Sequence, residues 1–375
     1  MSLILDRNRA PRSHTLVHVC GALMLLSVAT AIADTDAPRL PIVARVSTTI
    51  ENGELNPYGI AFVPAGFPEL GPLRAGDLLV SNFNNSSNVQ GTGSTIVRVT
   101  PHGHTSLFFD GTPGLGLTTA LGALKGGFVL VGSLPIPAGS CPPPVPGKGA
   151  LLVVDHNGQL VQTLDHPDFH LNGPWDLTIF DQGGQAKVFV SNVLDGTVTR
   201  LDLVVGSQGV TVHSATQVAS GYTFRCDPSA VVVGPTGLAY DAYRDLLYVA
   251  STADNKIYAV MNASKLKQSN GTGSVIYQDQ VHLHGPLGLV LAPNGHLIVS
   301  NGDAINGDPK QPSEIVEFTP AGKFIGQLLL DPNPDGPFGI AIAPNGDDDL
   351  FRFAAVNDNS NTVFVWTFRF EESPH

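Results

Sequence analysis

Amide and carboxylate side chains stand at the ends of short apolar segments, and their oxygens are the atoms that hard cations and polar ligands bind. Asn192 and Asn301 each close such a segment, and Asp176 follows a Gly-Pro-Trp sequence. We predict that Asp176, Asn192 and Asn301 hold a divalent cation: calcium, magnesium or zinc. The alternative is that these side chains cap turns by bonding nearby backbone groups.

Aromatic side chains follow a proline at three places. These are Tyr58, Trp175 and Phe338, and together they would offer a stacking surface for a small ligand. The polar residues that we predict to complete this ligand-binding site are Asn82, Asp254 and Asp358.

Histidine is the side chain best suited to general-base chemistry near neutral pH. His284 stands directly before a Gly-Pro sequence. In an enzymatic alternative, we assign His284 as the catalytic base and Asp176 as a second catalytic residue. The competing interpretation of His284 is an ordinary turn residue.

A repeated Gly-Pro-x-Gly-Leu/Ile motif sets the spacing of these residues. Its second glycines are Gly237, Gly288 and Gly339, each 51 residues after the one before. Degenerate copies lie at 56–60, at 173–177 and, more weakly, at 114–124. The copies define six units, and repeats of this length are typical of propellers, solenoids and arrays.

Each unit is predicted to supply up to four short strands, because apolar segments alternate with turn residues, as at 78–82, 95–99 and 105–109. The last unit has no fourth strand, and segment 42–48 is available to provide it. We therefore predict a six-bladed β-propeller, with its ring closed by this N-terminal strand. In such a ring, the starts of first strands and the ends of second strands meet at one mouth.

Composition agrees with an all-β chain and excludes nucleic acid as a partner. Only 14% of the 375 residues are charged, while glycine occurs 41 times and proline 29 times, as many tight turns require. The formal net charge is -12 and no cluster of lysine and arginine occurs. Binding of nucleic acid needs such a basic patch.

Residues 1–33 form a predicted secretory signal peptide. Basic residues at 7, 9 and 12 precede an apolar run that ends in Ala31-Ile32-Ala33. The alternative, a single membrane anchor, is disfavoured by polar residues within the run. We expect one domain over 34–375, a periplasmic or secreted location, and no stable membrane insertion after cleavage.

Two cysteines follow that segment, Cys141 and Cys226. Two lone cysteines in an oxidising compartment usually pair, and we predict a disulfide between them. This bond would fix the proline-rich segment 133–149 across the mouth.

The full motif, Gly-Pro-x-Gly-Leu/Ile-Ala followed by Pro-Asn-Gly-x-Leu-x-Val-Ser, resembles that of NHL-repeat propellers. The resemblance extends to the gluconolactonase and senescence-marker family and to the streptogramin lyases, and it covers residues 41–370. It implies the fold, because the motif specifies blades and not chemistry. Gluconolactonase-like proteins supply metal ligands from the starts of inner strands, where this chain has Tyr58, Trp175 and Phe338, which weakens the lactonase interpretation.

Two classes of function follow from these observations. The first is an exported propeller that binds a small molecule, or another envelope protein, at its central funnel. The second is a metal-dependent hydrolase or lyase acting in the same funnel. A protein-interaction scaffold is a third interpretation. A bound cation would favour the enzyme.

Overall fold

Antiparallel sheets make up nearly all regular structure in the computed structural model. It describes residues 45–49, 53–135, 149–227, 230–345 and 347–369, which lie in one unit spanning 36–374. Across these residues, six sheets have four strands and one has two. Their one helix is a 3-10 turn at Pro167–Phe169, and none is long and apolar enough to span a membrane. The all-β class is confirmed.

The four-stranded sheets follow one another along the chain, each as a run of neighbouring antiparallel strands. The first three sheets contain β2 (Leu55–Phe62), β3 (Leu78–Asn84), β4 (Thr95–Val99) and β5 (Thr105–Asp110); β6 (Leu117–Leu124), β7 (Phe128–Ser133), β8 (Ala150–Asp155) and β9 (Leu160–Leu164); and β10 (Pro174–Asp181), β11 (Gln185–Asn192), β12 (Thr197–Val205) and β13 (Val210–Ser220). The next two contain β16 (Pro235–Asp241), β17 (Leu246–Ser251), β18 (Lys256–Met261) and β19 (Ser274–Tyr277); and β20 (Pro286–Leu291), β21 (Leu297–Asn301), β22 (Glu314–Phe318) and β23 (Phe324–Leu329).

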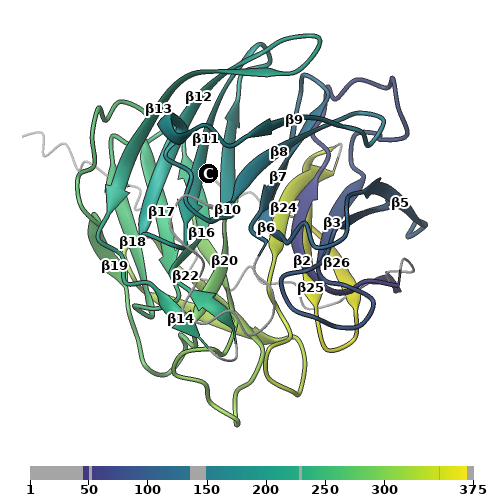
Figure 1. Cartoon of the computed structure of the whole chain (residues 1–375). Helices are drawn as coiled ribbons and strands as arrows, with labels where there is room; N and C mark the ends of the chain where they lie inside the picture. The colour runs from purple at the N-terminus through teal and green to yellow at the C-terminus, as the bar shows by residue number, and fades with distance from the viewer. Residues whose placement is uncertain (1–44, 50–52, 136–148, 228–229, 346, 370–375) are drawn as a thin grey trace, which may run out of the picture. The chain divides into compact units, whose positions relative to one another are not determined.

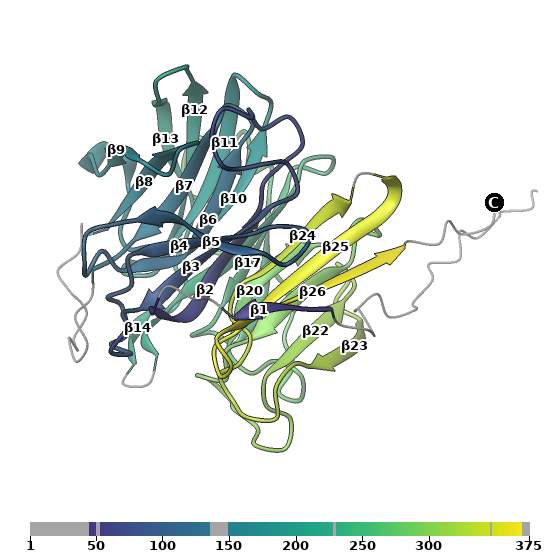
Figure 2. The same cartoon turned by 90° about the vertical axis from the view of Figure 1, so that its right-hand side faces the viewer.

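The sixth sheet joins the two ends of the described chain. It contains β24 (Ile340–Asn345), β25 (Asp347–Asn357), β26 (Thr362–Arg369) and β1 (Arg45–Thr49). β1 pairs with β26, with Arg45 opposite Val365, and Figure 2 shows the two strands side by side. The N-terminal strand therefore occupies the fourth position of a sheet whose other strands come last in the chain.

The first strands of successive sheets contact each other. β2 contacts β6, β6 contacts β10, β10 contacts β16, β16 contacts β20, β20 contacts β24, and β24 contacts β2. In Figure 1 these strands occupy the middle of the view, and the fourth strands, such as β5, β9, β13 and β19, lie outside them. The hydrophobic core lies between sheets, where residues such as Leu79, Val129 and Leu152 are buried in one cluster.

A glycine and a serine join neighbouring first strands in a repeated way. The Gly288 N–H donates to Ser300 Oγ (2.9 Å), and Ser300 Oγ donates to the Phe338 carbonyl of the next unit (2.5 Å). The Gly59 N–H and Ser81 Oγ (3.0 Å) make the same bridge to Thr118 O (3.1 Å). A Cβ on the repeated glycines would overlap the carbonyl of the next strand, so only glycine permits this close approach.

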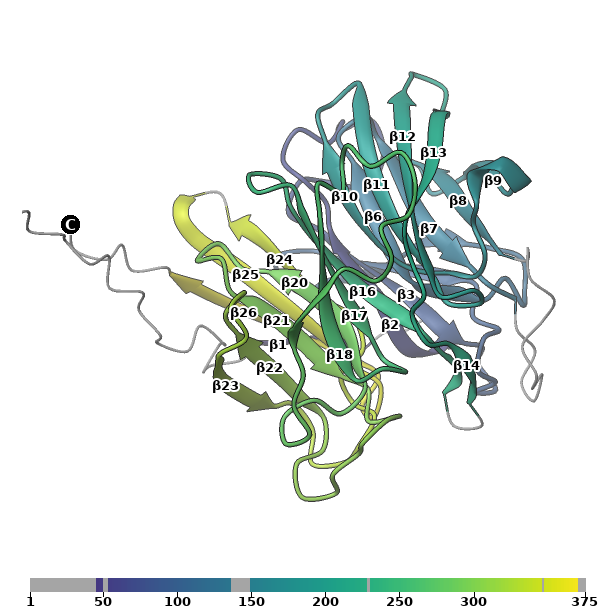
Figure 3. The same ribbon diagram turned by 90° about the vertical axis from the view of Figure 1, so that its left-hand side faces the viewer.

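The two-stranded sheet stands apart from the other six. It pairs β14 (Arg225–Asp227) with β15 (Val231–Val233), and it precedes β16 in the chain. Figure 3 shows β14 beyond the end of the larger strands. This short hairpin brings Val232 against the starts and ends of the inner strands, where it belongs to a cluster with Tyr58 and Leu287.

Candidate functional site

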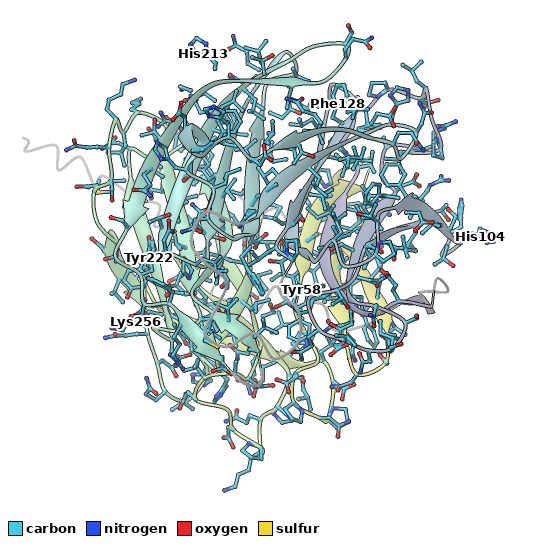
Figure 4. The ribbon with its side chains drawn as sticks, in the orientation of Figure 1. Tyr58, His104, Phe128, His213, Tyr222 and Lys256 are labelled. Carbon is cyan, nitrogen blue, oxygen red and sulfur yellow. The ribbon has the colours of Figure 1, made fainter. Side chains whose placement is uncertain are left out.

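A small pocket of about 120 Å³ lies where first strands start and second strands end. We call it the mouth pocket. In Figure 4 Tyr58, one of its walls, lies toward the middle of the view, and His104 and His213 lie at the edges. The residues that line the pocket are Asn56, Tyr58, Phe83, Gln90, Ala230, Val232, Val233, Thr236, Thr252, Leu287, Gly302, Ala304, Asp335, Phe338 and Asp358.

Aromatic rings form one wall of the mouth pocket. The Tyr58 ring stacks on Phe83 with centroids 4.6 Å apart, and Phe338 lies 4.7 Å from the same ring. Trp175 meets Tyr58 edge-on at 5.9 Å. All four rings come from different parts of the chain and pack in one apolar cluster. They give the pocket an aromatic surface, with rings at several inclinations, that suits an apolar or aromatic body.

Asn56 departs from the repeat at a position that favours glycine. Its φ is 60°, and the equivalent residues Gly173 and Gly285 have φ of 71° and 68°, whereas Gly234 and Gly336 lie outside the left-handed region. A side chain in this left-handed conformation is strained relative to glycine. The Asn56 side chain is 3% exposed, lines the mouth pocket, and leaves Oδ1 with no hydrogen-bond partner. Ten buried side-chain atoms of the described residues have no hydrogen-bond partner, and of their residues only Asn56 lines the mouth pocket, which makes Oδ1 a candidate contact for a ligand.

Two carboxylates, Asp335 and Asp358, also line the mouth pocket. Burial, reinforced by the nearby charge of Asp335, raises the pKa of Asp358 to about 6. Burial and the charge of Asp303 raise the pKa of Asp335. Asp303 also fixes this turn, because its Oδ2 accepts the backbone N–H of Asp335 (3.0 Å). Within the described ranges, the pocket lining includes both carboxylates and no lysine, arginine or histidine.

A second cavity, of about 320 Å³, runs between the first strands of the sheets. Among the described residues of its lining, Asp176 is the one charged side chain, and the others are mostly aliphatic. Asp176 also departs from the repeat, since Gly59, Gly237, Gly288 and Gly339 fill the equivalent positions. Burial raises the pKa of Asp176 well above its usual range, against the hydrogen bonds from the backbone of Leu177 and Leu238. The buried carboxyl therefore favours its neutral form.

The serine bridge changes where Asp176 replaces glycine. Ser191 Oγ accepts the Asp176 N–H (3.0 Å), as expected, but then donates back to the Asp176 carbonyl (3.4 Å) instead of to the next unit. The Asp176 side chain instead lies close enough to Leu238, in the next first strand, to receive a backbone hydrogen bond there. This substitution gives the cavity its single acid.

The predicted ligand-binding residues separate into two groups. Tyr58, Phe338 and Asp358 line the mouth pocket, and Trp175 supports it by contacting Tyr58. Asn82 is fully buried, and its Nδ2 donates to Thr95 Oγ1 (3.1 Å) within its own sheet. Asp254 accepts hydrogen bonds from Ser251 Oγ and the Thr223 N–H and is outside the pocket lining. The structure gives these two residues turn and strand roles.

The predicted metal ligands do not come together. Asn192 and Asn301 are fully buried, and Asp176 lines a different space. Asn301 Oδ1 accepts the His284 N–H (3.1 Å), and its Nδ2 donates to His282 O (2.8 Å). Asn192 bonds in the same way to the turn before its own sheet. Within the described ranges, no three His, Cys, Asp or Glu side chains are grouped to hold a metal ion.

Replacing Asn192 with alanine should lower the free energy of unfolding by about 2–4 kcal/mol, because several buried polar groups lose their partner. Asn192 Nδ2 donates to Thr197 Oγ1 and Thr199 Oγ1, each at 3.0 Å, and Oδ1 accepts the Asn172 N–H at 3.0 Å. Urea denaturation with calcium and with a chelator measures the effect, and the exposed Asn157→Ala serves as control. A calcium-dependent stability that Asn192→Ala removes would restore the metal assignment.

His284 has no free ring nitrogen for base catalysis. It is 1% exposed, with Nδ1 2.5 Å from the Asn306 carbonyl and Nε2 2.9 Å from the Val281 carbonyl. A general base must offer a lone pair to the substrate proton, whereas both nitrogens here face acceptors. This geometry does not favour the catalytic assignment, which stays a prediction, and in the structure His284 joins the turns on either side of it.

Cys226 is half-buried in β14, and Cys141 lies outside the described residues. Their disulfide therefore stays a prediction. The predicted signal peptide, residues 1–33, also lies outside the described residues.

Sequence reasoning missed Asp335, Phe83 and the loop around Val232 as parts of the mouth pocket. Asp335 stands in a proline-rich turn, Asp331-Pro332-Asn333-Pro334-Asp335, directly before a repeat motif. A signal was also present at Asn56, where the first motif has asparagine in place of glycine. Nothing in the sequence distinguished Phe83, because it is an apolar residue that continues an apolar strand.

Solved structures with a similar fold cover most of the chain. A gluconolactonase from Xanthomonas campestris is 14% identical, with a TM-score of 0.53 over 87% of this chain and 89% of that chain. Regucalcin, a calcium-binding protein from Agrobacterium tumefaciens strain C58, is 14% identical, with a TM-score of 0.51 over 86% and 92%. A virginiamycin B lyase from Staphylococcus aureus is 12% identical, with a TM-score of 0.48 over 87% and 88%.

The first two of these structures identify the fold as that of a β-propeller. No protein-family model and no curated protein matches the sequence. A lactonase and a calcium-binding protein share this fold at low identity, and such a fold carries different activities in different proteins. Function must therefore be argued from the mouth pocket and from Asp176.

Proposed function

We propose that this chain is an exported six-bladed propeller of the NHL-repeat kind that binds a small organic ligand in the mouth pocket. The observation that carries the proposal is Asn56, whose buried Oδ1 has no partner in a pocket with aromatic walls. A strained residue with an unsatisfied atom costs stability, and such costs are typical of binding sites.

Six blades in a closed ring are the arrangement that best accounts for the sheets. Six four-stranded sheets are present in the described residues, and contacts between first strands run from β2 through to β24 and back to β2. The short β14–β15 hairpin then counts as an insertion between two blades. In this arrangement the mouth pocket lies at one end of the ring, and the cavity with Asp176 lies along its axis.

A second candidate is a hydrolase or lyase that uses Asp176 as a proton donor. A carboxyl with a raised pKa in a mostly aliphatic cavity keeps its proton and can act as a general acid. A divalent cation would be its cofactor, and metal analysis of the purified protein tests for one. Loss of hydrolysis of a lactone substrate in Asp176→Asn, with the fold retained, would support this candidate.

Asn56→Gly should abolish ligand binding while keeping the fold. Glycine is the repeat's own residue and accepts a φ of 60° without strain, so the free energy of unfolding should stay equal or rise by up to about 1 kcal/mol. A thermal-shift screen of small organic molecules, run on both proteins, measures the effect. Compounds that raise the melting temperature of the parent should fail to raise that of Asn56→Gly.

The matched control is Asn262→Gly. Asn262 has a φ of 54° and is exposed in a turn after β18, away from the mouth pocket. It should respond to every compound as the parent does. Equal ligand shifts in the parent and in Asn56→Gly would place binding elsewhere and end the proposal.

A further inference from the structure

We propose that the mouth pocket selects a small organic cation, namely a primary ammonium group carried on a compact apolar body. This inference rests on the proposed function and adds the chemical class of the ligand. It follows from the charge of the lining, from the acceptor atoms and from the aromatic wall.

The charge of the lining favours a cation. Among the residues that the structure describes, Asp335 and Asp358 are its charged side chains, and no lysine, arginine or histidine joins them in the lining. Asp335 lies at the exposed rim, and Asp358 lies deeper. A negatively charged, partly desolvated pocket attracts a positive ligand more strongly than the same charges would in water.

The acceptor atoms match the donors of a primary ammonium group. Such a group carries three N–H donors, and the pocket offers Asn56 Oδ1 and two carboxylates. The two threonine hydroxyls of the lining donate to Pro286 O, from Thr236 Oγ1 at 3.2 Å and from Thr252 Oγ1 at 2.7 Å, so their protons are engaged and their oxygens can only accept from a ligand. The unpartnered Asn56 oxygen is thus an acceptor that the ligand would satisfy.

The rings of Tyr58, Phe83 and Phe338 set the size and nature of the rest of the ligand. Their faces and edges attract cations and apolar groups alike. The pocket volume of about 120 Å³ is below that of an engineered cavity of about 150 Å³ that holds benzene. A branched alkyl chain of a few carbons fills such a space. An inorganic cation has no apolar part to pack against the aromatic rings.

Calorimetric titration at pH 7.5 with isobutylamine and with isobutanol tests the inference, because the two probes share a shape and differ in charge. We expect isobutylamine to bind with one site per chain, and isobutanol to bind at least tenfold more weakly. Asp358→Asn should weaken isobutylamine at least tenfold and leave isobutanol unchanged. Asp335→Asn, nearer the rim, provides a second variant with the same expected direction.

The exposed Asp168→Asn is the control for net charge, since the Asp168 side chain is 87% exposed outside the pocket. It should bind both probes as the parent does. Ammonium chloride and calcium chloride, added as competitors, should not displace isobutylamine at equal concentration. Displacement by either salt would show that the pocket takes inorganic cations and would overturn the inference.

The outcomes separate the ligand class from the proposed function. If isobutanol binds as well as isobutylamine and Asn56→Gly abolishes both, the pocket binds ligands but the cation class is wrong. If the binding of isobutylamine survives Asn56→Gly and both aspartate variants, the amine binds elsewhere and the inference fails. If neither probe binds and the thermal-shift screen finds no compound that depends on Asn56, the proposed function fails as well.

Discussion

Asp358→Asn should raise the free energy of unfolding at pH 7.5 by up to about 3 kcal/mol while weakening the binding of isobutylamine at least tenfold. The pKa of Asp358 is raised from 3.8 to about 6, so the folded protein holds this proton at a pH where the unfolded chain has released it. Stability therefore falls as the pH rises from about 4 to about 6, and the whole penalty is present above that. Asparagine has the same shape and cannot ionise.

Urea denaturation of both proteins at pH 7.5 and pH 4.5 measures this difference. The gain should shrink to about 1 kcal/mol at pH 4.5, where Asp358 is mostly neutral in the folded protein. The groups that face Asp358 are Asp335, whose charge helps to raise its pKa, and Tyr58, whose own pKa is raised by burial. Asp168→Asn should show no gain at either pH. A variant no more stable than the parent at pH 7.5 would contradict the prediction.

Gly339→Ala should destabilise the protein by about 3 kcal/mol or more and open the contact between β24 and β2. A Cβ on Gly339 would overlap the Tyr58 carbonyl oxygen and press on Ile60 at 2.9 Å. Both neighbours belong to β2, so relief requires the two strands to move apart, and overpacking of this kind is costly. Because Tyr58 and Phe338 flank this contact, the mouth pocket should also be lost.

Thermal denaturation and amide hydrogen exchange of β2 and β24 measure this loss. Gly184→Ala is the matched control, since Gly184 lies in an exposed turn where an added Cβ meets nothing within 4 Å. It should stay within about 0.5 kcal/mol of the parent. A stable Gly339→Ala with unchanged exchange would show that β24 and β2 are not tightly joined.

The sheets could be predicted from the sequence because the residues that define each strand are close together in the chain and recur in every unit. Gly237, Gly288 and Gly339 recur at a fixed spacing, since each allows the same close approach to the next first strand. Alternation of apolar and turn residues then marks the strands. The pairing of β1 with β26 follows from the number of strands in each unit, because the last unit lacks a fourth strand. The strand propensity of residues 45–49 is not needed for this prediction.

The site was predicted only in part, because residue type does not reveal what a side chain already bonds. Tyr58, Phe338 and Asp358 do line one pocket. Asn192 and Asn301 have the composition of metal ligands, but their amides bond to turns before their own sheets. His284 likewise already bonds to a backbone carbonyl of a neighbouring turn, which residue type does not reveal. The informative signal was the departure from the repeat at Asn56 and Asp176, where a side chain replaces glycine.

The pairing of β1 with β26 also bears on the order in which the chain can fold. The other five four-stranded sheets use strands that are consecutive in the chain, and each can form soon after its residues are made. The sixth sheet must wait, because Arg45 finds Val365 only when nearly the whole chain is present. Contacts this distant in sequence form slowly. Until then β1 and the edge of β2 that will face β24 stay open, and during this interval the growing chain is most exposed to aggregation and proteolysis.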